Sequence, residues 1–272
     1  MQAPKRLYIF TGKGGVGKSL ISLAFARWLK ERGHKTLHVS LSQQVLGDDV
    51  RASVTSAPGG GWAEQRHLEL ETSARDYITK KLGSAMIANW IVGSAYFRAL
   101  VNMLPGFGYV ISLGHILEMI HTDPQLTVVL DAPASGHALT MMEATQNFRE
   151  IFQSGAVFED TEKMLSKLYD RSHTAIRILT LPTELALAEA EELRASLQQL
   201  AEFDSKIVLN HSLQPWRQEI ATAPDALLRK LALEDELLSK HATQISAKIP
   251  YCATTGRDAL YNDLQPTLEG LL

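Results

Sequence analysis

The sequence predicts an α/β fold in which a mainly parallel central sheet is flanked by helices and carries an apolar helical insertion. Strand-like and helix-like patterns alternate from Lys5 onward, as parallel sheets require. A short apolar run, Leu7–Phe10, leads into a glycine-rich segment and then a helical pattern. A second run, Leu126–Leu130, is continuously apolar, which is typical of a strand buried on both faces. The 272 residues fit one domain, 1–272.

The glycine-rich segment fits G-x-x-x-x-G-K-[ST], with a strand pattern before it and a helix pattern after it. Its glycines let consecutive backbone N–H groups face phosphate oxygens, and the helix adds its positive end. We expect Lys18 to contact the β- and γ-phosphates and the Ser19 hydroxyl to bind Mg²⁺. The segment therefore predicts a P-loop NTPase that binds ATP and Mg²⁺. The predicted nucleotide-binding residues here are Gly12, Lys13, Gly14, Gly15, Val16, Gly17, Lys18, Ser19 and Leu20.

Lys13 lies near the start of this loop, where an ordinary phosphate loop needs no lysine. The string GKGGVGKS resembles the deviant Walker A loop of the MinD, ParA and arsenite-pump ATPase (ArsA) group. The resemblance implies a dimer that encloses two nucleotides, with Lys13 reaching the partner's phosphates. It leaves open a homodimer or a heterodimer with a paralogous ATPase.

A second motif, Asp131-Ala132-Pro133-Ala134-Ser135-Gly136-His137, follows the buried strand and resembles the second switch of ArsA-like ATPases. An aspartate at the carboxyl end of a strand beside the phosphate loop can accept a hydrogen bond from Mg²⁺-bound water, so Asp131 joins Ser19 as a predicted metal-site residue. We expect Gly136 to let the backbone approach the γ-phosphate. His137 either couples nucleotide state to a helix starting at Ala138 or caps that helix.

The segment that corresponds to the first switch differs from that of the ArsA-like ATPases that the chain resembles. Ser42-Gln43-Gln44 stands where those ATPases carry an aspartate that orients the attacking water. Serine and glutamine are poor bases at neutral pH, and a general base contributes roughly 10²–10⁴-fold to the rate. Asp48 and Asp49 either substitute for it or are simply solvated. We therefore predict an ATPase whose hydrolysis is weak or partner-dependent. Its predicted catalytic residues are Lys13, Lys18 and Asp131.

Asn210 ends a strand pattern, Lys206–Asn210, at the position where the resembling family contacts adenine. An amide offers the donor and acceptor that the adenine edge requires. The competing interpretation is a buried asparagine with a structural role.

Residues 81–118 form a long apolar region whose only formal charge between its ends is Arg98. Asn89, Arg98 and Asn102 interrupt the run, which argues against a membrane-spanning helix. Two interpretations remain. These are core helices, or they line a groove for varied apolar partners, because every methionine after the first lies between 86 and 164. The resemblance favours the second, since the branch that targets tail-anchored proteins forms its client groove here.

We accordingly predict a helical subdomain from about residues 73–121 and 138–171. The alternation of His67–Glu71 predicts a short strand before it, and Ser73 is the expected N-cap of its first helix.

Composition limits the function. A net charge of −3 gives no electrostatic reason to expect a nucleic-acid partner. The single cysteine, Cys252, excludes a multi-cysteine arsenite site within the chain. The first residues lack a signal-like apolar core, which predicts a cytoplasmic protein. The tail 257–272 is too short and acidic for a basic membrane-targeting helix, so we expect membrane contact to be only indirect.

Three functions follow in order of preference. The first is a dimeric ATPase switch coupled to a hydrophobic protein segment or protein partner. The second is the energising subunit of an anion or arsenite pump, and the third is a positioning switch of the ParA or MinD kind.

Overall fold

The computed structural model describes residues 4–41, 61–104, 106–151, 153–154, 156–220, 224–254 and 256–272. Within these ranges the centre is a seven-stranded sheet of order β3-β2-β4-β1-β5-β6-β7, and each adjacent pair is parallel. The predicted α/β class and parallel sheet are confirmed. The strands are β1 (Leu7–Gly12), β2 (Thr36–Leu41), β3 (Glu64–Leu68), β4 (Thr127–Asp131), β5 (Thr174–Thr180), β6 (Asp204–Ser212) and β7 (Ile245–Pro250).

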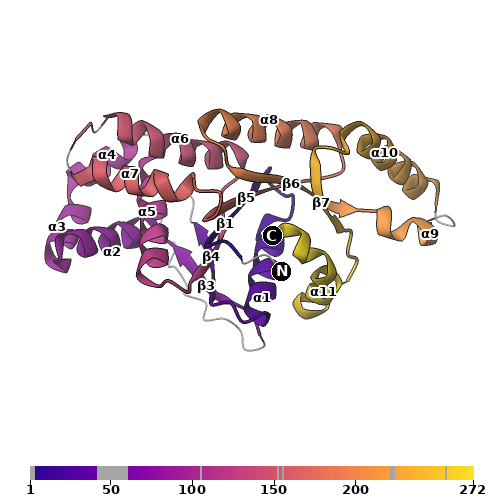
Figure 1. Ribbon diagram of the computed structural model, residues 1–272, viewed down its shortest axis with the longest axis horizontal. Helices are drawn as coiled ribbons and strands as arrows, with labels where there is room; N and C mark the ends of the chain where they lie inside the picture. Colours follow the sequence, from indigo (N-terminus) through magenta and orange to yellow (C-terminus); the bar gives the residue numbers. More distant parts are fainter. Residues whose placement is uncertain are drawn as a thin grey trace.

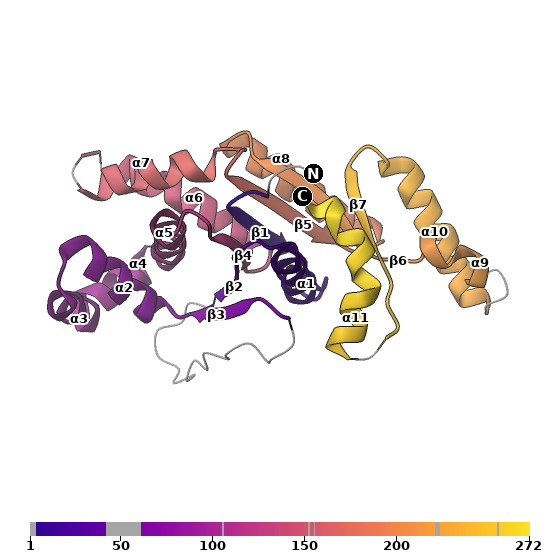
Figure 2. The ribbon, with the colours of Figure 1, turned by 60° about the horizontal axis from the view of Figure 1, so that its bottom comes forward.

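Two helical layers cover the sheet (Figures 1 and 2). One layer is made of α1 (Lys18–Glu31), α11 (Arg257–Leu264) and the 3₁₀ helix η2 (Gln265–Leu271). The opposite layer is made of α5 (Phe107–Thr122), α6 (Ser135–Ile151), α7 (Ala156–Leu168) and α8 (Glu184–Leu200). Strand residues alternate between them: Leu7 and Ile9 join the second layer, whereas Tyr8 and Phe10 join the first.

The remaining helices lie toward the two ends of the molecule in Figure 1. At one end are α2 (Leu70–Leu82), α3 (Ala85–Gly93) and α4 (Ala95–Met103). At the other end are η1 (Gln214–Trp216), α9 (Arg217–Ile220) and α10 (Asp225–His241). The sheet therefore separates α2–α4 from α9–α10.

A short strand does precede α2, but it spans Glu64–Leu68, so the predicted bounds His67–Glu71 and the predicted cap at Ser73 are wrong. The third strand ends at Leu68, and α2 begins at Leu70. Leu70 and Ala74 pack in one apolar cluster with residues of α3, α4 and α5, so their four-residue spacing favours a helix over the apparent alternation. Ser73 is buried within the helix, and its hydroxyl has no hydrogen-bond partner among the described residues.

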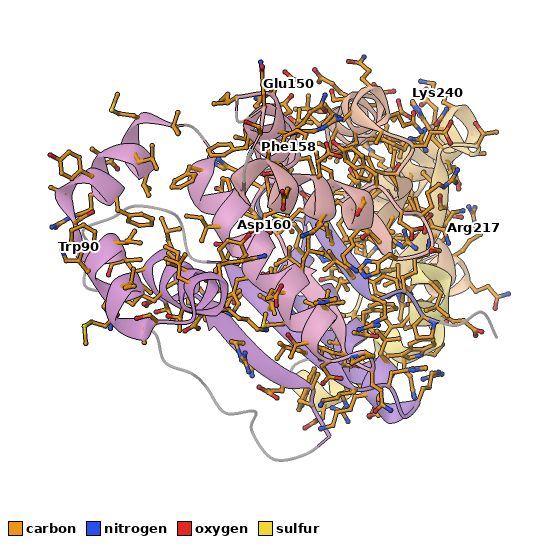
Figure 3. The ribbon with its side chains drawn as sticks, turned by 60° about the vertical axis from the view of Figure 1, so that its left-hand side comes forward. Trp90, Glu150, Phe158, Asp160, Arg217 and Lys240 are labelled. Carbon is orange, nitrogen blue, oxygen red and sulfur yellow. The ribbon has the colours of Figure 1, made fainter. Side chains whose placement is uncertain are left out.

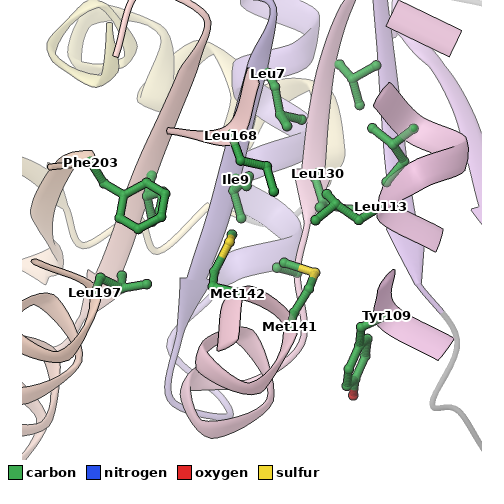
Figure 4. Close-up of a cluster of buried hydrophobic side chains, with 14 of the residues drawn as sticks. Leu7, Ile9, Tyr109, Leu113, Leu130, Met141, Met142, Leu168, Leu197 and Phe203 are labelled. Carbon is green, nitrogen blue, oxygen red and sulfur yellow. The ribbon is translucent and has the colours of Figure 1, made fainter. Parts of the chain in front are cut away.

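The methionines do not gather on one surface. Met141 and Met142 are 0% and 2% exposed and contribute to the core (Figure 4), where Met164 is also buried. Met86 and Met103, in contrast, are 82% and 77% exposed. The expectation that the methionines mark a common groove is therefore wrong for those three core residues, which fill space between the helices and the sheet.

Within the part of the chain that the structure describes, no single helix is long and apolar enough to cross a membrane. Only α4 and α5 together meet that test of length and composition, and they are bent by 104° relative to each other. The same ranges contain no group of three or more His, Cys, Asp or Glu residues that could hold a metal ion.

A buried histidine of β2 makes stability depend on pH. His38 is 6% exposed, and its Nε2 lies 2.9 Å from the Ser22 hydroxyl of α1. Burial lowers the pKa of His38 to about 4, from a usual value of 6.5. Because the unfolded chain then binds a proton that the folded chain excludes, we expect stability to fall as the pH drops from 6.5 toward 4.

The expected contribution of His38 is a loss of about 2 kcal/mol between pH 7 and pH 5. Urea denaturation of the His38→Gln variant should show a smaller loss over this interval than the wild-type chain. His121→Gln, at an exposed histidine, is the matched control. An equal loss in wild type and His38→Gln would contradict this assignment.

Candidate nucleotide-binding site

The candidate site lies at the carboxyl ends of the central strands. The glycine-rich loop connects β1 to α1, and Phe10 of β1 pairs in register with Asp131 at the end of β4. Parallel pairing thus places the second motif beside the loop. This juxtaposition is the one that the sequence predicts.

Two glycines of the loop have backbone conformations and neighbours that exclude a side chain. Gly12 has φ 141°, and an added Cβ would lie 2.1 Å from the Leu179 carbonyl oxygen. Gly17 has φ 89°, and its Cβ would lie 2.6 Å from Asn210 Nδ2. At Gly14 and Gly15 a Cβ would meet no atom within 4 Å. The loop is therefore packed against β5 and β6 at its ends and open at its middle, where phosphates could approach.

Lys18 lies over this loop. Its ammonium group donates hydrogen bonds to the carbonyl oxygens of Gly12, at 3.1 Å, and Lys13, at 3.0 Å. Burial lowers the pKa of Lys18, and the nearby Asp131 charge opposes this shift. The lysine is thus held at the loop as a cation that can meet phosphate oxygens.

Asp131 is partly buried, and only one of its carboxylate oxygens has a hydrogen-bond partner in the described part of the chain. Burial raises its pKa, while a hydrogen bond from Ser19 and the Lys18 charge act in the opposite direction. Its Oδ1 atom is buried and has no hydrogen-bond partner within the described ranges. An unpartnered buried oxygen is costly, and water bound to Mg²⁺ would supply the missing donor. The hydroxyl of Ser19 and the carboxylate of Asp131 are oxygen ligands of the kind that Mg²⁺ prefers.

Lys13 pairs within its own chain. Its ammonium nitrogen lies 2.6 Å from Glu189 Oε1 on α8, and both side chains are partly exposed. Nothing local in the sequence indicates this contact, because Glu189 lies 176 residues away from Lys13. The predicted contact of Lys13 with a partner's phosphates remains a prediction.

Asn210 of β6 stabilises the loop through a side-chain hydrogen bond. Its side-chain nitrogen donates to the Val16 carbonyl oxygen at 2.9 Å, and the residue is only 2% exposed. This contact is the structural role that competes with adenine recognition. The adenine contact itself remains a prediction.

The second motif continues directly into α6. This helix begins at Ser135, so the start expected at Ala138 is wrong and His137 lies within the first turn instead of capping the helix. The His137 ring is 6.2 Å from the ring of Tyr109, a residue of α5 that sequence reasoning did not single out. At Gly136 an added Cβ would meet nothing within 4 Å, so this backbone stays accessible. Ser42, Gln43, Gln44, Asp48 and Asp49, the residues discussed for the first switch, lie outside the described residues.

Comparison with known proteins agrees with this geometry. A family model described as an anion-transporting ATPase (ArsA) matches residues 5–49, which include the entire loop. The chain is ArsA-like. Its match to the arsenical pump-driving ATPase of Escherichia coli is 25% identical over 268 residues, covering 91% of this chain and 41% of the relative.

Two further relatives extend the ArsA-like comparison. ATPase BagA of Mycobacterium tuberculosis is 27% identical over 225 residues, covering 76% of this chain and 65% of BagA. ATPase GET3B of Arabidopsis thaliana is 21% identical over 269 residues, covering 78% of this chain and 65% of GET3B. This ArsA-like chain thus spans less than two thirds of the length of each of the three relatives.

Proposed function

We propose that this ArsA-like chain binds and hydrolyses Mg²⁺-ATP as a dimeric switch, and that the nucleotide state controls binding of a hydrophobic protein segment. The unpartnered Oδ1 atom of Asp131, beside Ser19 and Lys18 at an open glycine loop, carries the nucleotide part of the proposal. The names of the relatives support an ATPase of this kind.

In this proposal each residue of the site has one task. The backbone of the loop and Lys18 hold the phosphates and stabilise negative charge that develops on them. Ser19 and Asp131 hold Mg²⁺, which would neutralise phosphate charge. Lys13 adds a further positive charge across the dimer interface. Because no described residue is an evident base for water, we expect turnover to be slow in the isolated chain.

Steady-state turnover of Mg²⁺-ATP, measured across protein concentration, tests this function. A dimeric ATPase should give a rate that rises more steeply than protein concentration, and Lys18→Ala provides the blank. Tight nucleotide binding without turnover would indicate a chain that works beside a hydrolytic partner. Failure to bind ATP at all would contradict the proposal.

Glu189 provides a second test, because its contact with Lys13 competes with the proposed role of Lys13 in a partner's site. An exposed ion pair is worth about 0.2–1 kcal/mol, so Glu189→Gln should raise turnover at low protein concentration by up to about fivefold. Glu192→Gln, at an exposed acidic residue of the same helix, is the control. Unchanged or lower turnover in Glu189→Gln would exclude this competition.

The client part of the proposal relies on an exposed apolar surface on α3, α4 and the end of α2, which we call the apolar tip. Trp90 lies at its outer edge (Figure 3) and is 75% exposed, and the 89% exposed Tyr96 continues it. Few charges accompany these residues, so an apolar helix of another protein fits this surface better than a charged partner does. Its exposed members are Leu82, Met86, Ile87, Trp90, Tyr96, Leu100 and Met103.

A chain of ring contacts links the apolar tip to the nucleotide site. Phe107 of α5 stacks on Phe148 of α6 with ring centroids 5.2 Å apart, and it lies 6.2 Å from Phe97 of α4. The α6 helix begins within the second motif. Movement of α6 on nucleotide exchange would therefore reach α4 through these rings. This is the route by which we expect ATP to change client binding.

Retention of a labelled apolar helical peptide, measured with ATP, with ADP and without nucleotide, tests client binding. We expect affinity to differ between nucleotide states and to fall in the double variant Trp90→Ser and Met86→Ser. Leu233→Ser, an exposed leucine on α10, is the control. Equal retention in all variants and states would contradict the client proposal.

The names of the arsenical pump-driving relatives support a second candidate function, the energising subunit of an anion pump. Arsenite- or antimonite-stimulated turnover by the purified chain would favour it over the client proposal. Binding to DNA or liposomes that weakens with salt would instead favour a positioning switch.

A further inference from the structure

A second cavity lies away from the nucleotide loop, between α2, α5 and α7. Its volume is 440 Å³, which is within the range of small-molecule sites. The apolar part of its wall includes Leu117 of α5 and Met164 of α7. Gly114 of α5 lets Tyr77 and Met164 pack closely against this wall, since an added Cβ would lie 3.2 Å from the Tyr77 ring and 3.4 Å from Met164 Sδ.

Both carboxylates of the cavity already have partners. Asp160, labelled on α7 in Figure 3, accepts hydrogen bonds at one oxygen from Lys81, at 2.7 Å, and at the other from the Tyr77 hydroxyl, at 3.1 Å. Glu118 pairs with Lys80 at 3.1 Å. The negative charges that line this cavity are therefore neutralised by the protein itself.

The positive charges are not balanced in the same way. Lys163 and Lys167 lie four residues apart on α7 and line the cavity, and neither has an ion pair with a described residue. Like charges at this spacing repel by a few tenths of a kcal/mol, which an anion between them would offset. Ser166, between the two lysines, adds a hydroxyl to the same rim.

We propose that this cavity binds a small organic anion, with its phosphate or carboxylate group between Lys163 and Lys167 and a compact apolar body against Leu117 and Met164. This site is separate from the nucleotide loop, and the proposal does not depend on ATP hydrolysis. An apolar floor beneath a few convergent charged groups is the usual composition of a small-molecule site.

Isothermal titration of the full chain with 1-naphthyl phosphate and with 1-naphthoate tests the proposal. We expect saturable one-to-one binding of at least one of these probes, and weaker binding of 1-naphthol and of inorganic phosphate. The double variant Lys163→Gln and Lys167→Gln should lose at least about tenfold in affinity, because hydrogen bonds to charged groups are among the stronger ones. Arg229→Gln with Lys230→Gln, two exposed cations of α10, is the control with the same change in charge.

Two further variants locate the binding. Ser166→Trp should block the cavity while leaving both lysines in place, and it changes only an exposed residue. Lys18→Ala, which alters the nucleotide loop, should leave probe binding intact. The proposal is overturned if neither probe binds, if 1-naphthol or phosphate alone binds as tightly, or if binding survives the double lysine change. Loss of binding in Lys18→Ala would assign the probe to the nucleotide loop and would also overturn it.

Discussion

Replacing Lys18 by alanine is expected to weaken ATP binding by at least about 100-fold and to remove turnover. The Lys18 ammonium group is held directly over the loop by its hydrogen bonds to the carbonyl oxygens of Gly12 and Lys13. Loss of two charge-assisted contacts to phosphate costs about 3–5 kcal/mol, which corresponds to this factor or more. Fluorescent-nucleotide titration measures the affinity, and a radiolabelled ATP assay measures the turnover.

A matched control separates loss of the site from loss of net charge. Lys230→Ala removes an exposed lysine on α10 and should bind ATP like the wild-type chain. A circular-dichroism melting curve checks that Lys18→Ala is folded. If folded Lys18→Ala bound ATP within threefold of wild type, the glycine loop would not be the nucleotide site.

The largest effect on stability is expected at Arg177, a fully buried arginine of β5. Its guanidinium donates to the Leu271 carbonyl oxygen at 2.6 Å and to Asp204 Oδ2 at 3.4 Å. Burial lowers the pKa of Arg177, while the charge of Asp204 opposes that shift. Replacement by methionine would leave the Leu271 carbonyl oxygen without this donor and Asp204 with Lys5 as its remaining described cation, at a cost of about 2–4 kcal/mol.

Urea denaturation of Arg177→Met, followed by tryptophan fluorescence, measures this cost. Arg171→Met is the control, because Arg171 is exposed and lies 3.8 Å from the exposed Glu202. Its free energy of unfolding should change by less than about 0.5 kcal/mol. Equal midpoints for the two variants would show that the Arg177 contacts contribute little.

The sequence predicted the parts of the site that depend on local patterns. The glycine loop needs positive φ at Gly17, a property that belongs to the residue type, and its strand and helix are visible on either side. Asp131 could be placed beside this loop because parallel strands present their carboxyl ends at one edge of a sheet. Such inferences need no knowledge of distant contacts.

Features that depend on distant contacts escaped prediction. The pairing of Lys13 with Glu189 joins two partly exposed side chains far apart in sequence, and many other acidic residues were equally plausible partners. The start of α2 was not predicted, because the alternation of apolar and polar residues around Leu70 indicated a strand, whereas burial of Leu70 against other helices favours a helix. Likewise, methionine composition alone could not separate the buried Met141 from the exposed Met86.

The strand order also determines when the nucleotide loop can be completed during synthesis. The first strand pairs with β4 and β5, and Asn210 reaches back 194 residues to hold Val16. At roughly 5–20 residues per second, a ribosome takes about 10–40 s to add these residues. Leu7–Phe10 is an apolar strand with no partner on either side until β4 and β5 have been made, and such a segment is prone to aggregate. Nascent chains halted before Thr127 should therefore be captured by chaperones, and chains halted before Asn210 should not bind ATP.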